Sequence, residues 1–208
     1  MIRGDLSNRL IHLTKGRTPE EASAAFSSIL RDGRLRGGEG HIRGRHKCVC
    51  FSEAPLGTLT QILADPTVHG MRYAPLGVMV SKAWLFSRGG RPVIYQSEDE
   101  YETLPDSLRY RHVRYEPDRA IDHTWEREWR VLADELALDP DEATLVVPTR
   151  AWEDRFLQDY VISHRNAVLL LDVVDSVSRM DKFPWHFVVL EDLGVTMDWP
   201  PPTEDVGL

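Results

Sequence analysis

The sequence of 208 residues lacks the short motifs that mark several enzyme classes. It contains no P-loop, no GxGxxG pattern after a strand, no HExxH pair and no G-x-S-x-G elbow. Its histidines and cysteines form no metal-binding pattern either. We therefore expect no metal site, and neither metal-dependent hydrolysis nor serine-type acyl transfer.

Cysteines and long apolar runs are equally scarce. Cys48 and Cys50 are the two cysteines, which are too few for a zinc site, and we expect them to be buried, reduced thiols. No segment approaches the roughly 18 apolar residues of a membrane-spanning helix. The first residues, Met1 to Asp5, lack the apolar core of a signal peptide. These observations predict a cytoplasmic protein without a membrane partner.

An overall positive charge is also missing. The formal net charge of -8 argues against non-specific binding of nucleic acid through a broad basic surface. Basic residues are nevertheless concentrated between Arg31 and Lys47, here called the basic segment, which contains six basic and two acidic residues. Residues 34–47 of this segment have few apolar side chains to bury. We therefore expect a mobile basic loop with a role other than packing.

The apolar pattern predicts an α+β domain built on one or two mainly antiparallel sheets. Thr18 followed by Pro19 predicts the start of a helix, and Gly33 its end. The other elements expected are strands at residues 10–14, 48–52, 113–115, 145–148 and 185–190, two strands joined by an aromatic connection within 77–96, and helices ending near residues 63 and 159. Residues 167–174 suit either a buried strand or a helix. We expect one domain over residues 1–195 and an extended proline-rich tail over 196–208.

Residues 122–132, DHTWEREWRVL, are the most unusual stretch because they combine carboxylates, arginines and tryptophans. If the end of the stretch is extended, its side chains alternate between two faces. The acidic and aromatic residues then lie on opposite faces, with Glu126, Glu128 and Arg130 against Trp125, Arg127 and Trp129. A carboxylate beside an arginine and a tryptophan is in a setting that shifts its pKa and orients a ligand. Trp84, Trp125 and Trp129 are expected to lie in the core.

Three polar features are not explained by packing. They are the pair His12 and Thr14 on the first predicted strand, the basic segment, and the glutamates that precede Trp129. Arginines suit a diphosphate, a polar strand can hold a ribose, and a glutamate can polarise a ribose hydroxyl. Together they suit cleavage of the glycosidic bond to nicotinamide, in which a nearby anion stabilises an oxocarbenium-like centre.

The order of these motifs resembles that of the ADP-ribosyltransferase superfamily, most closely the DarT-like branch that modifies nucleic-acid bases, together with related abortive-infection proteins. The matching motifs are His12-Leu-Thr14, a helix ending at Asp32-Gly33, basic residues before Val49-Cys-Phe51, and Arg127-Glu-Trp-Arg-Val131. They cover about residues 8–133. The resemblance implies split antiparallel β-sheets around an NAD cleft, with peripheral helices.

The resemblance also implies roles for individual residues. It assigns His12 and Thr14 to a ribose of NAD. It assigns Glu128 to catalysis together with His12, with Glu126 as a competing assignment. For the phosphates of NAD it implies either Arg43 or Arg45. For nicotinamide it implies either Phe51 or Tyr95. The implied activity is NAD-dependent ADP-ribosylation of a DNA or RNA base by a toxin or phage-defence effector, with an antitoxin as an implied partner.

Other interpretations of the same residues remain open. An NAD-independent RNA-processing enzyme would use His12, Lys47 and His123. A non-catalytic antitoxin or adaptor would instead present the tryptophans and the acidic tail as an interface. The acceptor is also open, since protein is an alternative to nucleic acid. Glu128 paired with an arginine is equally compatible with a structural ion pair.

Overall fold

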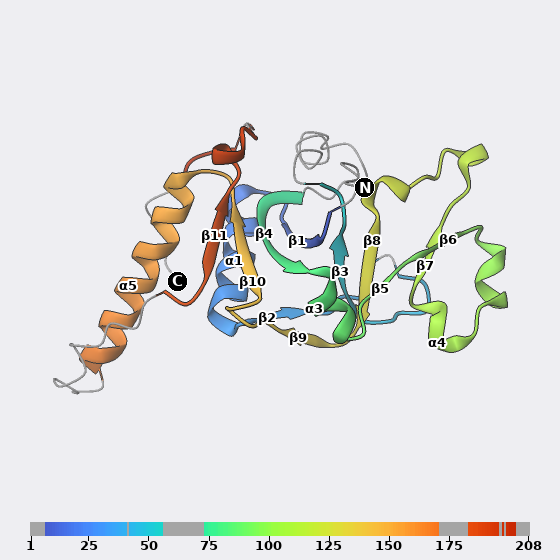
Figure 1. Cartoon of the computed structure of the whole chain (residues 1–208), viewed down its shortest axis with the longest axis horizontal. Helices are drawn as coiled ribbons and strands as arrows, with labels where there is room; N and C mark the ends of the chain where they lie inside the picture. Colours follow the sequence, from blue (N-terminus) through green and yellow to red (C-terminus); the bar gives the residue numbers. More distant parts are fainter. Residues whose placement is uncertain are drawn as a thin grey trace.

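A seven-stranded, mostly antiparallel sheet forms the centre of the structure (Figure 1). This computed structural model describes residues 7–40, 42–55, 73–170, 183–195, 197 and 199–202. The strand order is β11-β10-β4-β1-β3-β8-β5, and β10 and β11 are parallel to each other. The strands are β1 (Arg9–Lys15), β3 (Cys48–Ser52), β4 (Tyr73–Ser81), β5 (Arg91–Pro92), β8 (Glu128–Leu132), β10 (Ala143–Val147) and β11 (His186–Val189).

Four described α-helices and two small sheets surround this sheet. The helices are α1 (Pro19–Asp32), α3 (Lys82–Ser87), α4 (Asp106–Arg109) and α5 (Arg150–Leu170). The small sheets pair β2 (Arg34–Arg36) with β9 (Glu135–Ala137), and β6 (Ile94–Gln96) with β7 (His112–Arg114). The 3-10 turns are η1 (Asp99–Thr103), η2 (Pro117–Arg119), η3 (Thr124–Glu126) and η5 (Glu191–Leu193). The predicted α+β class is confirmed, and α5 and α4 lie at opposite ends of the molecule (Figure 1).

The first helix has the boundaries that the sequence predicts. The Thr18 hydroxyl accepts a hydrogen bond from the backbone N–H of Glu21, and Pro19 occupies the first helical position, where no N–H is needed. The helix ends at Gly33, whose φ of 60° is in the left-handed region that favours glycine. Its buried face, which includes Ala22 and Phe26, packs onto the sheet.

The main core lies between the sheet and three helices. Phe26 of α1, Trp84 of α3 and Phe156 of α5 belong to one buried cluster with Val49 and Val131 of the sheet. The rings of Phe26 and Phe156 meet edge to face with centroids 5.0 Å apart. Burying an aromatic side chain of this size contributes about 1.5–3 kcal/mol, so the three aromatic side chains are a substantial part of the stability of this core.

Several local predictions are corrected by the structure. The segment expected as a loop over residues 34–47 begins with β2, which pairs with β9. The aromatic connection after β4 is the helix α3, and the second strand expected within residues 77–96 is divided into β5 and β6, which belong to different sheets. Part of the predicted tail is anchored, since Trp199 packs against the core. The short helix expected to end near residue 63 lies outside the described residues.

The long C-terminal helix settles one open alternative. Residues 167–170 belong to α5, while the rest of the apolar run to residue 174 lies outside the described residues. Within the described ranges, no helix is both long enough and apolar enough to cross a membrane.

The pairing between β1 and β3 is much shorter than that between β1 and β4. Among the described residues, Ile11 opposite Ser52 is the one pair in register between β1 and β3. In contrast, β1 and β4 are in register from Arg9 opposite Ser81 to Lys15 opposite Tyr73. The sheet therefore parts after Ile11, and the polar residues of β1 face this opening.

Candidate functional site

A cavity of about 800 Å³ lies where β1 and β3 part. Its wall combines β1, β3 and the start of β8 with α1, the basic segment, β7 and the turn of residues 122–127, here called the glutamate turn. Ligand sites for small molecules typically enclose roughly 300–1,000 Å³. The cavity is therefore large enough for a small-molecule ligand of substantial size.

Most of the site residues suggested by the sequence line this cavity. They are His12, Thr14, Arg43, Phe51, Glu126 and Glu128. Arg45 and Tyr95 are not among the lining residues. Arg45 is exposed on a left-handed turn, with a φ of 55°. The structure thus brings together residues from widely separated parts of the chain, and it leaves the two alternative ligand contacts outside.

Glu128 is held by a two-point ion pair with Arg130. The Arg130 Nε and Nη2 donate to the two carboxylate oxygens of Glu128, each at 2.9 Å. The side chains of Arg130 and Glu128 are 7% and 13% exposed. Arg130 Nη1 also donates to the backbone carbonyls of Tyr110 and His112. The pair is therefore rigid, and it holds the Glu128 carboxylate in one orientation at the cavity wall.

Glu126 lies in a different electrostatic setting. Burial and the nearby charge of Glu128 raise the pKa of Glu126 to about 7. It is not on the strand, because residues 124–126 form a 3-10 turn and Arg127 has a φ of 45°. The predicted alternation of side chains therefore begins only at Glu128. The cavity nevertheless contains Glu126 as a second carboxylate, and its raised pKa suits acid–base chemistry near neutral pH.

His12 bridges the parted strands. Its Nδ1 lies 2.8 Å from the backbone carbonyl oxygen of Cys50. Because a carbonyl can only accept, Nδ1 carries the proton in this contact. Burial lowers the pKa of His12, so the neutral ring is favoured and its Nε2 acts as an acceptor. Thr14 donates its hydroxyl to the carbonyl of Leu76, which fixes the next polar side chain of β1.

The glutamate turn is pinned at its backbone. The Tyr95 hydroxyl donates to the carbonyl of His123 at 3.2 Å and accepts from the N–H of Glu128 at 3.3 Å. The Ser52 hydroxyl donates to the carbonyl of Glu126 at 2.7 Å. Tyr95 therefore acts on both ends of the turn from outside the cavity. This is a different position from the nicotinamide contact suggested by the sequence.

Trp125 is the aromatic residue that the sequence placed wrongly. It was expected in the core with Trp84 and Trp129, but it is 37% exposed and lines the cavity. Trp84 is buried, and Trp129 packs against the core and donates its indole N–H to Glu53. The short 3-10 turn aims the side chain of Trp125 differently from the strand that follows, so its ring is available for stacking.

The charge of the cavity wall differs from that of the whole chain. Five lining side chains are cationic and three are carboxylates, whereas the formal net charge of the chain is -8. The cationic side chains are Lys15, Arg36, Arg43, Arg114 and Arg130. The four arginines form ion pairs with carboxylates of the chain, so an anionic ligand would compete with those carboxylates for them.

Some of these lining residues carry no clear signal in the sequence. Lys15 and Arg114 lie on β1 and β7, and nothing in their local pattern distinguishes them from solvated charges. Cys50 was expected to be buried, but it is half-buried beside Glu128, and burial raises the pKa of its thiol. Both cysteines are free. Only the pairing of β3 with β8, which sets Cys50 opposite Arg130, identifies its place in the site.

No group of three or more potential ligands that could hold a metal ion occurs in the part of the chain that the structure describes. Comparison of the chain with family models, with curated proteins and with solved structures finds no match.

Proposed function

We propose that this chain is an NAD-dependent ADP-ribosyltransferase that modifies a nucleic-acid base. The observation that carries the proposal is the cavity at the parting of β1 and β3, where Glu128, clamped by Arg130, lines the same space as the neutral His12. The parting also supports the split-sheet architecture that the sequence resemblance implies.

The proposed reaction needs a fixed negative charge more than it needs an acid. Nicotinamide leaves NAD as a neutral molecule, and an oxocarbenium-like ribose carries the developing positive charge. The Glu128 carboxylate is positioned to accept a hydrogen bond from a ribose hydroxyl and to stabilise that charge. Its ion pair with Arg130 keeps it oriented, so little reorganisation is needed as the bond breaks.

The acceptor step calls for a group that can take a proton. A base nitrogen that attacks the ribose carbon gives up a proton as the new glycosidic bond forms. Glu126 has a pKa of about 7 and suits this role near neutral pH. The exposed Trp125 ring beside it can stack on a planar base, which favours a nucleic-acid acceptor over a protein side chain.

The alternative RNA-processing site is less well supported. His12 and His123 line the cavity, but Lys47 is not among the lining residues and forms an ion pair with Asp134 at 3.2 Å. The three groups of that site therefore do not share one space. We propose the transferase as a toxin or phage-defence effector, for which the neutralising partner would be an antitoxin.

The deciding experiment uses NAD labelled in its adenylate phosphate. The purified chain is incubated with this NAD and with separate pools of DNA, RNA and protein, and label on each pool and free nicotinamide are measured. We expect label on a nucleic acid, abolished by Glu128→Gln and by His12→Ala. The matched control is Glu135→Gln, which removes an exposed carboxylate on β9. RNA cleavage without NAD would support the second enzyme, and equal labelling by Glu128→Gln would refute the assigned site.

A further inference from the structure

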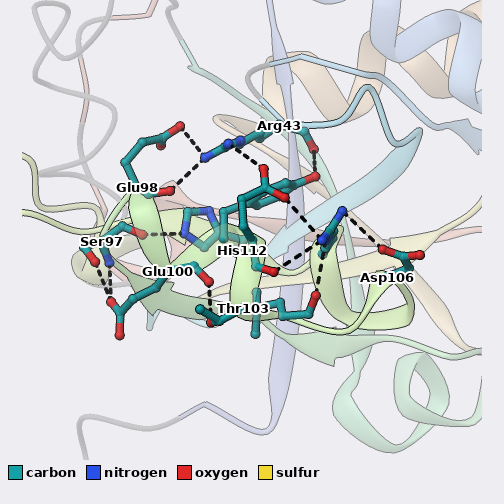
Figure 2. Close-up of polar contacts among 11 residues, drawn as sticks. Arg43, Ser97, Glu98, Glu100, Thr103, Asp106 and His112 are labelled. Atoms are coloured by element: carbon teal, nitrogen blue, oxygen red, sulfur yellow. Dashed lines mark hydrogen bonds and ion pairs between the residues drawn. The ribbon is translucent and has the colours of Figure 1, made fainter.

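Arg43 is held by carboxylates of the chain itself. Its Nη1 donates to the backbone carbonyl and to the side-chain Oε1 of Glu98, both at 2.7 Å, and its Nη2 donates to Glu102 Oε1 at 2.9 Å. Its guanidinium lies over the ring of Tyr101, 4.0 Å from the centroid. The Tyr101 hydroxyl donates to the Arg43 carbonyl at 3.4 Å. Figure 2 shows Arg43 reaching toward Glu98 in this cluster, here called the Arg43 clasp.

The clasp joins two parts of the cavity wall that are distant in sequence. Arg43 belongs to the basic segment, while Glu98 lies just before η1 and Glu102 lies within it. Arg43 and Glu98 both line the cavity. The contact therefore links two parts of the cavity wall, and Arg43, which the sequence resemblance offers with Arg45 for the NAD phosphates, is already neutralised.

Replacing the carboxylate partners of Arg43 by another anion costs little free energy. The side chains of Arg43, Glu98 and Glu102 are 36%, 48% and 63% exposed, so each ion pair is weak and is screened by salt. When Arg43 leaves, Glu98 returns to water. Glu102 keeps a second partner, because Arg109 Nη2 lies 3.3 Å from its Oε2. The clasp therefore leaves no buried, unpaired charge when it opens.

We propose that Glu98 and Glu102 are internal competitors for a diphosphate ligand at Arg43, so that binding of the ligand opens the clasp. The inference rests on the proposed function in that the diphosphate is that of NAD. A phosphate group offers several charged acceptor oxygens and pairs with the planar guanidinium through two parallel hydrogen bonds. Binding and clasp opening are then linked, and each shifts the other.

The test is equilibrium binding of inorganic pyrophosphate and of ADP-ribose, measured by titration calorimetry. In the variant Glu98→Gln/Glu102→Gln we expect both ligands to bind about three- to tenfold more tightly, because two weak competing pairs are removed. The matched control is Asp99→Asn/Glu100→Gln, which removes the same charge from the same 3-10 turn. Glu100 accepts hydrogen bonds from Ser97, so this control leaves the clasp in place (Figure 2).

A third variant tests the arginine itself. Arg43→Gln is expected to weaken pyrophosphate binding about tenfold or more, because it removes the charged two-point donor. The proposal is overturned if Glu98→Gln/Glu102→Gln binds pyrophosphate no more tightly than the control variant, or if Arg43→Gln binds it as well as the wild type. Thermal melting of each variant confirms that it is folded. Failure of the proposed function would appear separately, as absence of nicotinamide release with the binding pattern intact.

Discussion

Replacing Glu128 by glutamine is expected to lower the free energy of unfolding by about 3 kcal/mol. The carboxylate accepts two charge-assisted hydrogen bonds from Arg130, each at 2.9 Å, and both side chains are largely buried. Glutamine keeps one oxygen that can accept from Arg130. Its amide N–H group, however, faces the guanidinium, which is also a donor, so the second hydrogen bond is lost. Breaking a buried pair costs roughly 3–5 kcal/mol. The lower end applies here because Arg130 keeps its bonds to the carbonyls of Tyr110 and His112.

Thermal melting followed by circular dichroism measures this change. For a chain of this size, about 3 kcal/mol lowers the melting temperature by roughly 6–12 °C. The control Glu135→Gln breaks an exposed pair with Arg34, whose cost is at most about 1 kcal/mol. A Glu128→Gln melting temperature within about 2 °C of the wild type would show that the anchored carboxylate does not exist in solution. The transferase assay, run well below either melting temperature, then separates lost activity from lost folding.

Three further predictions concern Glu126 in the cavity wall and two residues, Tyr95 and Gly77, that contact the elements of that wall. The folded pKa of Glu126, about 7, lies above the ordinary value of 4.5, so Glu126 contributes a loss of stability as pH rises from 4.5 to 7. Urea titrations of Glu126→Gln should lack this contribution, and wild-type and variant profiles that run parallel over that range would refute the shift. Tyr95→Phe should destabilise by about 1 kcal/mol and lower kcat for transfer more than it raises KM for NAD, and an unchanged kcat would contradict its positioning role. Gly77→Ala should cost about 1–3 kcal/mol in thermal melts, because the new Cβ would meet the His12 carbonyl oxygen at 2.5 Å, and an unchanged melting temperature would refute that close approach.

Local signals in the sequence predicted the elements well where one physical cause dominates. The helix α1 is delimited by the Thr18 cap and by Gly33, both of which act within a few residues. The strand β3 matches its predicted span because its apolar run is short and bounded by polar residues. The α+β class follows from many such short elements, since each reports only its own neighbourhood.

The glutamate turn escaped prediction because alternation fails where the backbone leaves the strand. Residues 124–126 form a 3-10 turn, and Arg127 takes a left-handed conformation that no local pattern required. The turn is stabilised from outside by Ser52 and Tyr95, which are distant in sequence. For the same reason Trp125 was expected in the core, although its ring lies at the cavity.

The partners of the arginines were the least predictable feature, and the proposed ligand exchange depends on them. The basic segment looks unpaired in the sequence because its counter-charges are remote: Glu98 and Glu102 for Arg43, and Glu135 for Arg34. Exposed pairs of this kind are worth little individually, so selection for stability alone gives no strong reason to place two carboxylates on one arginine at a cavity rim. A weak, reversible neutralisation is what the proposed exchange requires, because a diphosphate can displace exposed carboxylates at little cost. The sequence therefore indicated which residues carry charge, and the three-dimensional pairing indicates which of those charges a ligand can displace.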